Sequence, residues 1–219
     1  MNKYFVLGIE TSGILCSIAW WQNHQTLLEY NIERKNAHAT ILAKLVDDGF
    51  KELNLEPKVL TFVAVGSGPG SFTGLRIGMA YAKGLCYGLN IPLIPVSHFE
   101  LLADQANNNS YPIYTLIDAR KGNFYVAVFN TNKTIQNENY IINVKQLEKI
   151  LPQSANIIIY HENLKGSFIE SFDKKEYIIE GKYSADRICA LGLNKYINKE
   201  YLGIDQTEPF YLQSFAGVL

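Results

Sequence analysis

The residues with the clearest chemical potential lie in a glycine-rich loop that follows an apolar run. Leu60 to Val65 is typical of a buried strand, Gly66 to Ser71 supplies three glycines and a proline, and Phe72 to Leu89 has the length of a helix. Backbone N–H groups at the start of a helix attract anions, so this loop could cradle a phosphate. It could equally be a tight strand-to-helix turn that binds no ligand.

The known phosphate-binding patterns do not fit this loop. A Walker loop needs Gly-Lys-Ser/Thr, whereas Phe72 and Thr73 stand where the lysine is required. The dinucleotide-binding pattern fails because Gly66, Gly68 and Gly70 leave no third glycine at the required offset. We therefore favour a tight turn that leads into a closely packed helix over a nucleotide site.

Small residues recur at every fourth position of that helix, at Gly74, Gly78, Ala82 and Cys86. Glycine inside a helix costs up to about 1 kcal/mol relative to alanine. Two glycines on one face therefore predict that another backbone comes very close to it. The pattern leaves open whether that backbone is the protein's own sheet or a partner.

Two hydroxyls next to the glycines, those of Ser71 and Thr73, were considered as nucleophiles. A nucleophile needs a base within hydrogen-bond reach and a third group that orients the base, and no His or Lys lies nearby in the sequence. The hydroxyls fit better as N-caps of the following helix. The sequence thus predicts no catalytic residue, and a peptidase is the least favoured function.

The histidines do not form a metal-binding pattern. His38 stands at the start of a predicted helix, but its i+4 neighbour is Leu42, so two imidazoles cannot share one face. His24, His98 and His161 are isolated, and each is expected to be a surface or capping residue. We expect neither a metal nor another cofactor.

The composition is that of a soluble globular protein. The 219 residues are 47% hydrophobic and 19% charged, with a net charge of −1, which argues against a basic nucleic-acid binder that works alone. No apolar run approaches the roughly 20 residues of a membrane span. The three cysteines, Cys16, Cys86 and Cys189, are far apart in apolar surroundings and are predicted to be reduced core thiols. We expect a cytoplasmic protein without a signal segment.

The two halves of the chain follow the same order of predicted elements. In the first half, three strands at 4–10, 14–21 and 26–32 precede a helix at 38–54, the 60–65 strand, the 72–89 helix, a strand at 91–96 and a helix at 98–106. After a polar linker at 107–112, the second half repeats this order with strands at 113–118, 124–129 and 135–142. A helix at 145–150, a strand at 157–160, a helix at 164–172, a strand at 177–179 and a helix at 185–198 follow.

An internal duplication explains this repetition best. The sequence predicts an α/β protein with two actin-like (ASKHA) lobes, each βββαβαβα, that face one another across a cleft. The predicted lobes are 1–108 and 112–204, and a tail at 205–219 can return to the first lobe. This architecture is an analogy of fold and does not by itself define an activity.

Each half also places an acid at the end of its first strand. In actin-like enzymes the two hairpins grip nucleotide phosphates, so Glu10, Thr11, Ser12, Asp118 and Arg120 are candidates for vestigial phosphate loops. Alternatively, the two acids accept N–H bonds within tight turns. We favour the turns, and independent ATP hydrolysis is not expected.

Four segments together resemble the TsaB (YeaZ) family. They are Gly68–Gly78, Ile9–Ser12, Ile117–Arg120 and the C-terminal Glu208–Leu212. The long glycine motif is specific, and the matches are spread over nearly the whole chain, although the second half diverges between its motifs.

The resemblance implies a role in forming threonylcarbamoyladenosine beside the anticodon of tRNAs that read codons starting with A. In that system a separate synthase makes threonylcarbamoyl-AMP, and the paralogue TsaD transfers the threonylcarbamoyl group to tRNA at its metal site. The resemblance further implies that TsaB is a non-catalytic subunit, which pairs with TsaD, works with the ATPase TsaE, meets tRNA only within the complex and forms a homodimer when alone.

With this resemblance, the small-residue helix face is assigned to a partner, and Gly78→Arg is expected to abolish pairing in a folded monomer. The alternative function is a stand-alone nucleotide-dependent ATPase or kinase. The full predicted interface is Ile41, Leu45, Gly70, Ser71, Phe72, Thr73, Gly74, Ile77, Gly78 and Ala82.

Overall fold

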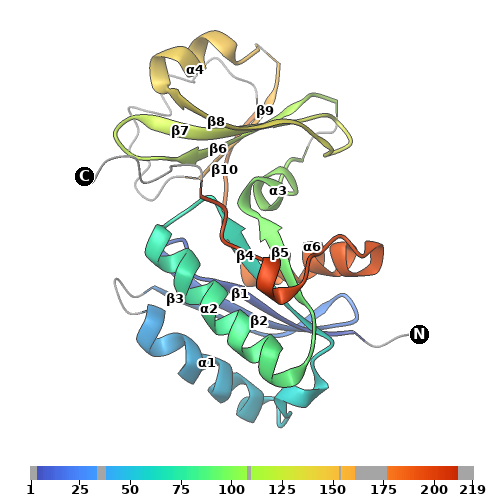
Figure 1. The fold of residues 1–219 in the computed structure, drawn as a ribbon. Helices are drawn as coiled ribbons and strands as arrows, with labels where there is room; N and C mark the ends of the chain where they lie inside the picture. Colours follow the sequence, from blue (N-terminus) through green and yellow to red (C-terminus); the bar gives the residue numbers. More distant parts are fainter. Residues whose placement is uncertain (1–3, 34–37, 108–109, 153, 161–176, 212–219) are drawn as a thin grey trace. The chain divides into compact units, whose positions relative to one another are not determined.

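The computed structural model describes residues 4–33, 38–107, 110–152, 154–160 and 177–211. The chain forms two compact units, the first comprising Met1–His98 and Tyr183–Phe210 and the second comprising Phe99–Lys182 and Tyr211–Leu219. Each unit contains one five-stranded sheet (Figure 1).

The sheet of the first unit has the strand order β3-β2-β1-β4-β5. β1 (Phe5–Glu10), β2 (Leu15–Gln22) and β3 (Gln25–Glu33) form the predicted antiparallel meander. β4 (Phe62–Gly68) and β5 (Leu93–Ser97) add strands parallel to β1. Three parallel strands therefore end side by side at one edge of this sheet.

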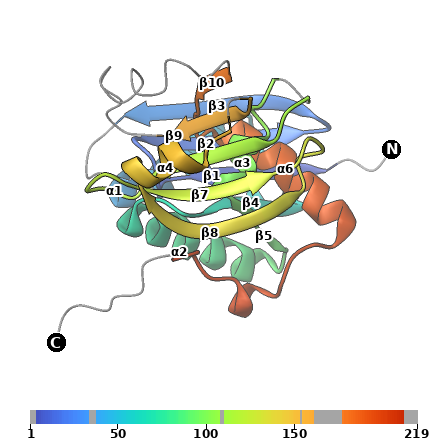
Figure 2. The ribbon, with the colours of Figure 1, turned by 90° about the horizontal axis from the view of Figure 1, so that it is seen from above.

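Helices cover both faces of the first sheet. α1 (His38–Glu52) and α2 (Phe72–Leu89) pack against one another (Figure 1), and α2 runs along one side of β1 and β4 (Figure 2). Alternate residues of the strands, such as Leu7 and Ile9, belong to the hydrophobic core on this side.

The other face of this sheet carries α6 (Ala185–Asn198). A Cβ on Gly8 of β1 would lie 2.4 Å from the Ala185 carbonyl oxygen, so the strand and the helix come into close contact. The structure therefore differs from the predicted boundary, which assigned this helix to the second lobe. Its apolar stripe was found in the sequence, but such a stripe does not specify which sheet it covers.

The sheet of the second unit repeats the order of the first as β8-β7-β6-β9-β10. β6 (Ile113–Asp118), β7 (Asn123–Phe129) and β8 (Ile135–Asn143) are antiparallel, while β9 (Asn156–Tyr160) and β10 (Tyr177–Glu180) run parallel to β6. α4 (Val144–Ile150) follows β8. The shared topology confirms two actin-like units, and the helix predicted at 164–172 lies outside the described residues.

The chain leaves the first unit earlier than the predicted linker. α3 (His98–Ala103) begins at the crossing itself, and only its first residue belongs to the first unit. The reason lies just beyond α3, where the Gln105 side chain donates to the Lys182 carbonyl at 2.8 Å and accepts from the Lys182 N–H at 2.9 Å. These bonds join α3 to the returning chain within the second unit.

The described residues of the C-terminal motif that belong to the first unit lie against the glycine loop and α2. The Phe210 N–H donates to the Ser67 carbonyl at 2.7 Å, and Lys83 of α2 pairs with Glu208 at 2.8 Å. Two motifs that are 140 residues apart in the sequence thus belong to one structural feature.

Candidate functional site

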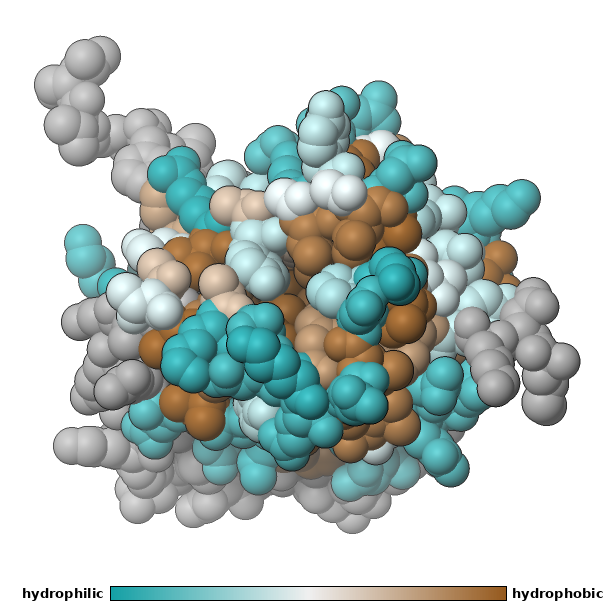
Figure 3. Space-filling model, turned by 90° about the horizontal axis from the view of Figure 1, so that it is seen from below, coloured by the Kyte–Doolittle hydropathy of each residue, from teal (hydrophilic) through white to brown (hydrophobic). Residues whose placement is uncertain are grey.

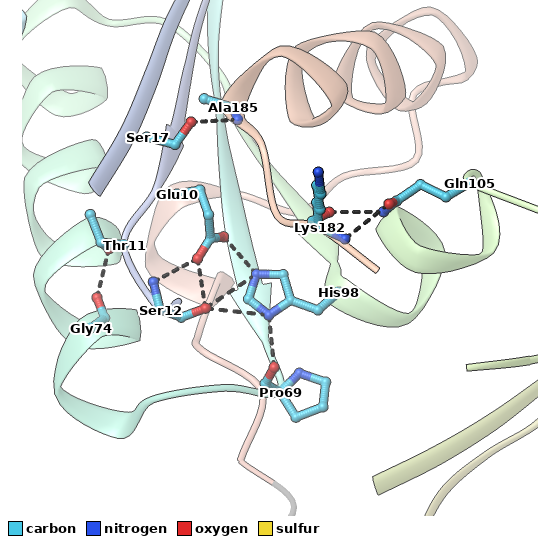
Figure 4. Close-up of polar contacts among 10 residues, drawn as sticks. All are labelled: Glu10, Thr11, Ser12, Ser17, Pro69, Gly74, His98, Gln105, Lys182 and Ala185. Carbon is cyan, nitrogen blue, oxygen red and sulfur yellow. Dashed lines mark hydrogen bonds and ion pairs between the residues drawn. The ribbon is translucent and has the colours of Figure 1, made fainter. Parts of the chain in front are cut away.

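The candidate site lies where β1, β4 and β5 end. Loops at the carboxyl ends of adjacent parallel strands are the usual place for ligands in α/β sheets. Here β1 contributes Glu10, β4 leads into the glycine loop, which we define as residues 66–70, and β5 is followed by His98 (Figure 4). The fold therefore brings together residues that are up to 88 positions apart.

Glu10 and His98 form a buried ion pair at this edge. Glu10 Oε2 lies 2.6 Å from His98 Nε2, and the two side chains are 1% and 0% exposed. The other ring nitrogen, Nδ1, lies 2.7 Å from the Pro69 carbonyl of the glycine loop. The second carboxylate oxygen of Glu10 accepts from both the N–H and the hydroxyl of Ser12, each at 2.6 Å (Figure 4).

The partners of this pair define its protonation. A carbonyl oxygen only accepts, so His98 Nδ1 donates to Pro69. Nε2 faces the Glu10 carboxyl, and the lowered pKa of that carboxyl together with the raised pKa of the ring places the shared proton on Nε2, so the ring is an imidazolium beside a carboxylate. Burial alone would raise the pKa of Glu10 and lower that of His98. Their opposite charges and hydrogen bonds outweigh burial, so the Glu10 pKa is lowered and the His98 pKa is raised.

Two glycines of the loop make room for this ion pair. A Cβ on Gly66 would lie 1.9 Å from Glu10 Oε2 and 2.6 Å from His98 Nε2. A Cβ on Gly70 would lie 2.7 Å from the Ser12 hydroxyl oxygen. The glycines are thus explained by contacts within the protein, as the tight-turn interpretation requires.

Ser12, His98 and Glu10 contain the residue types of a hydrolase triad but not its geometry. The Ser12 hydroxyl is bonded to Glu10 and lies 3.5 Å from each ring nitrogen, while both nitrogens already face other acceptors. Ser12 is also buried, at 2% exposed. An imidazolium cannot act as a general base, so this cluster does not activate a nucleophile.

The small-residue face of α2 is packed inside the first unit, and this corrects its assignment to a partner interface. A Cβ on Gly74 would lie 2.1 Å from the Thr11 carbonyl oxygen, and one on Gly78 would lie 2.4 Å from the Thr11 hydroxyl oxygen. That hydroxyl donates to the Gly74 carbonyl at 2.7 Å, and Ala82 is fully buried. The backbone that approaches the glycines is the loop after β1, so Gly78→Arg cannot leave the monomer intact.

The remaining residues of the predicted interface are at least partly exposed. Ser71 is the N-cap of α2, as predicted, and its side chain accepts from the Gly74 N–H at 3.3 Å. Thr73 is exposed and lies inside the first turn of α2, so it is not the cap. The partly exposed members are Ile41, Leu45, Gly70, Ser71, Phe72 and Ile77.

The two hairpin acids both lie in turns, although in different environments. Asp118 accepts from the Arg120 N–H at 2.8 Å, and Arg120 and Lys121 adopt positive φ angles of 67° and 54° in a tight turn. The candidate phosphate residues of the first hairpin have internal partners, because Thr11 bonds to α2, Ser12 bonds to Glu10, and Glu10 faces His98. These side chains do not fit a metal or phosphate site.

The described residues contain no group of three or more His, Cys, Asp or Glu side chains that could hold a metal ion. No described helix combines the length and apolar character that a membrane crossing requires. All three cysteines are buried and unpaired, as predicted. Burial, aided by the charge of Glu10, raises the pKa of Cys16 to about 11, and burial raises that of Cys86 to about 12, so both thiols are inert.

His98 is the site residue that sequence reasoning missed. The sequence predicts a surface or capping position for it, because it is isolated from the other histidines in a segment of its own. A signal was available in Glu10, since a buried acid at a strand end requires a donor. The sequence does not indicate which of the four histidines supplies it.

Comparison with known proteins assigns the family. Residues 30–195 match the family described as "TsaD: tRNA N6-adenosine threonylcarbamoyltransferase". The chain is 32% identical to the tRNA threonylcarbamoyladenosine biosynthesis protein TsaB of Bacillus subtilis over 57% of this chain and 54% of that protein. It is 30% identical to TsaB of Buchnera aphidicola subsp. Baizongia pistaciae over 67% of this chain and 69% of that protein. The match thus spans about half to two thirds of these relatives.

A solved structure agrees with the fold. The crystal structure of a Pseudomonas aeruginosa protein "with similarity to peptidase YEAZ" superposes with a TM-score of 0.78 over 96% of this chain and 100% of that chain, at 21% sequence identity. At this identity the likeness concerns the fold alone, whereas the sequence matches define the relationship. The chain belongs to the TsaB (YeaZ) family.

Proposed function

We propose that this protein is a non-catalytic subunit of the complex that forms threonylcarbamoyladenosine beside the anticodon of tRNAs reading codons that start with A. The observation that carries this proposal is the similarity to TsaB, a protein named for threonylcarbamoyladenosine biosynthesis, over 67% of this chain. In this proposal the chain works in the cytoplasm, pairs with a TsaD-type transferase, and supports recruitment of a TsaE-type ATPase.

The non-catalytic role is supported by the state of the first hairpin. A carboxylate that orders a metal ion needs free oxygen lone pairs directed at the ion. Both oxygens of Glu10 are engaged by protein donors, and its charge is matched by His98. Protein donors thus take three of the roughly four lone-pair directions of the carboxylate, and the side chain carries no unmatched charge with which to attract a metal–nucleotide complex.

The exposed sides of α1 and α2 are the surface that we assign to the partner. The interface predicted from the sequence loses Gly74, Gly78 and Ala82, because these residues are buried in the monomer. It keeps the partly exposed apolar side chains of α1 and α2, and Tyr87 at the end of α2 is 80% exposed. The kept apolar residues are Ile41, Leu45, Phe72 and Ile77.

Burying such side chains stabilises an association by roughly 1.5–3 kcal/mol each. Figure 3 shows hydrophobic patches between hydrophilic side chains on the face of the molecule that it draws, so apolar surface is available for association. We propose that the same α1 and α2 surface forms a homodimer when the partner is absent.

The proposal is tested by depleting the protein and measuring the modified nucleoside in total tRNA by liquid chromatography and mass spectrometry. We expect threonylcarbamoyladenosine to fall, and to return when the wild-type chain is supplied. Other modified adenosines in the same digest are the internal control. An unchanged amount of threonylcarbamoyladenosine after complete depletion would overturn the proposed function.

A further inference from the structure

We propose that the Glu10–His98 ion pair is a positioning pair that holds the glycine loop, and with it the exposed first turn of α2, in the conformation that a partner binds. The part that concerns the loop stands on the structure alone. The part that concerns the partner rests on the proposed function, and the experiments below separate the two.

While Glu10 is ionised, the charged His98 ring makes two bonds that a neutral ring cannot make together. His98 donates to Glu10 at 2.6 Å and to the Pro69 carbonyl at 2.7 Å. A neutral imidazole has one N–H, so loss of the proton leaves either Glu10 or the Pro69 carbonyl buried without its donor. Either loss is strongly unfavourable at a buried site, so the pair and the position of the loop change together.

The glycine loop is closely fitted to the pair. Gly66 and Gly70 both approach it so closely that a Cβ at either position would overlap Glu10, His98 or Ser12. Two titratable side chains lie against the pair: Cys16 of β2, whose thiol pKa is raised by burial and by the charge of Glu10, and Tyr183 before α6, whose ring stacks on His98.

The glycine loop leads directly to exposed residues. Pro69 is followed by Gly70, Ser71 and the first turn of α2, where Phe72 is partly exposed and Thr73 is exposed. Within the loop, the Ser67 carbonyl accepts from the N–H of Phe210 in the C-terminal motif at 2.7 Å. A shift of the Pro69 anchor would therefore reach both the start of α2 and the C-terminal motif.

His98 also lies where the chain passes between the two units. It is the last residue of the first unit before the chain leaves, and Tyr183 is the first after it returns. The two rings stack, with centroids 4.3 Å apart and planes 22° apart. The imidazolium thus joins the glycine loop to both crossing points of the chain.

The loop part is tested with the full chain labelled with ¹⁵N-histidine. We expect His98, assigned with His98→Gln, to keep an imidazolium spectrum at pH 7.5, where an imidazole with an ordinary pKa is mostly neutral. A His98 that is neutral at this pH would overturn the inference.

Amide hydrogen exchange then measures how strongly the loop and the start of α2 are protected. In Glu10→Gln we expect amide exchange in residues 70–74 to accelerate at least tenfold. Asp118→Asn, which changes the corresponding acid of the second hairpin, should leave it unchanged. If Glu10→Gln does not fold, the wild type is measured up to pH 10 instead. After correction for intrinsic exchange, loop protection should fall as His98 loses its proton, and constant protection through that titration contradicts the inference.

The partner part is tested by titrating a TsaD-type paralogue with the wild type and with Glu10→Gln at pH 7.5. We expect at least tenfold weaker binding by the variant. Equal affinity of the two proteins, despite faster loop exchange, would show that the pair does not position the binding surface. If the wild type does not bind the paralogue at all, the proposed function fails, while the spectra and the exchange data still decide the loop part.

Discussion

Glu10 Oε2 lies 2.6 Å from His98 Nε2 in the interior of the first unit, directly beneath the glycine loop. This contact explains three features of the sequence together, namely an acid at the end of the first strand, a histidine after the fifth, and glycines between them. Both oxygens of the acid accept hydrogen bonds from donors within the protein.

The ion pair predicts a characteristic pH dependence of stability. The His98 pKa is raised in the folded state, so its contribution is complete below the unfolded value of 6.5 and is lost as pH rises through the folded pKa. The Glu10 pKa is lowered, so its contribution is complete above 4.5 and is lost as pH falls through the folded pKa. The pair therefore stabilises most between pH 4.5 and 6.5.

The measurement is the free energy of unfolding by urea at several pH values, for the wild type and for His98→Gln. Removing one partner of a buried ion pair typically costs about 3–5 kcal/mol. We expect the difference between the two proteins to be largest between pH 4.5 and 6.5 and to shrink on either side. A difference that stays constant from pH 4 to pH 10 would mean that the pair is not ionised.

Two glycines of α2 predict opposite effects of the same substitution. Gly74→Ala places a Cβ 2.1 Å from the Thr11 carbonyl oxygen, and such overpacking against backbone destabilises by about 1–3 kcal/mol. Gly84 has no atom within 4 Å of its Cβ position, so Gly84→Ala should stabilise the protein by up to about 1 kcal/mol through helix propensity. Thermal melts of both variants provide the comparison, and equal shifts of the two melting temperatures would contradict the packing of this face.

The sequence predicted the features that depend on neighbouring residues, and it did not predict those that depend on contacts between residues far apart in the chain. The bounds of α2 and α6 were predicted correctly because Ser71 and Ser184, local N-caps, define where these helices begin. The prediction that the glycine face of α2 meets a partner was wrong, because a pattern of small residues is the same whether the face packs inside the protein or on a partner. The Glu10–His98 pair was missed because it joins residues 88 positions apart.

The exposed first turn of α2 predicts an effect on pairing without an effect on folding. Thr73→Glu adds an acid near the start of a helix, which favours the helix dipole, so the monomer should melt at or slightly above the wild-type temperature. It also places a charge on the surface that we assign to the partner, and we expect at least tenfold weaker binding of a TsaD-type paralogue. Thr134→Glu, the same change at an exposed position of the second unit, is the matched control. Equal binding by both variants would remove α2 from the interface.

The engaged side chains of the first hairpin predict that the isolated protein does not bind nucleotide. With both oxygens of Glu10 bonded and the Thr11 and Ser12 hydroxyls donating to Gly74 and Glu10, no side chain of this hairpin is available to hold Mg²⁺. Isothermal titration with ATP and Mg²⁺ should give no binding tighter than about 1 mM. A micromolar Kd together with turnover would instead support the alternative of a stand-alone ATPase.

The same buried contacts predict that the protein is not a serine peptidase. Ser12 is buried and bonded to Glu10, and Ser71 caps α2. Treatment with a fluorophosphonate should leave the intact mass unchanged, with a known serine peptidase as the positive control. Stoichiometric labelling of Ser12 or Ser71 would refute this assignment.

The central claim is that this chain enables another subunit's chemistry without performing any itself, and reconstitution of the transfer reaction tests it most directly. Threonylcarbamoyl transfer from threonylcarbamoyl-AMP to tRNA would be measured with a TsaD-type paralogue, a TsaE-type ATPase and ATP, with and without this protein. We predict transfer only when this protein is present, and none with this protein alone. Transfer by this protein alone, or full transfer in its absence, would contradict the account.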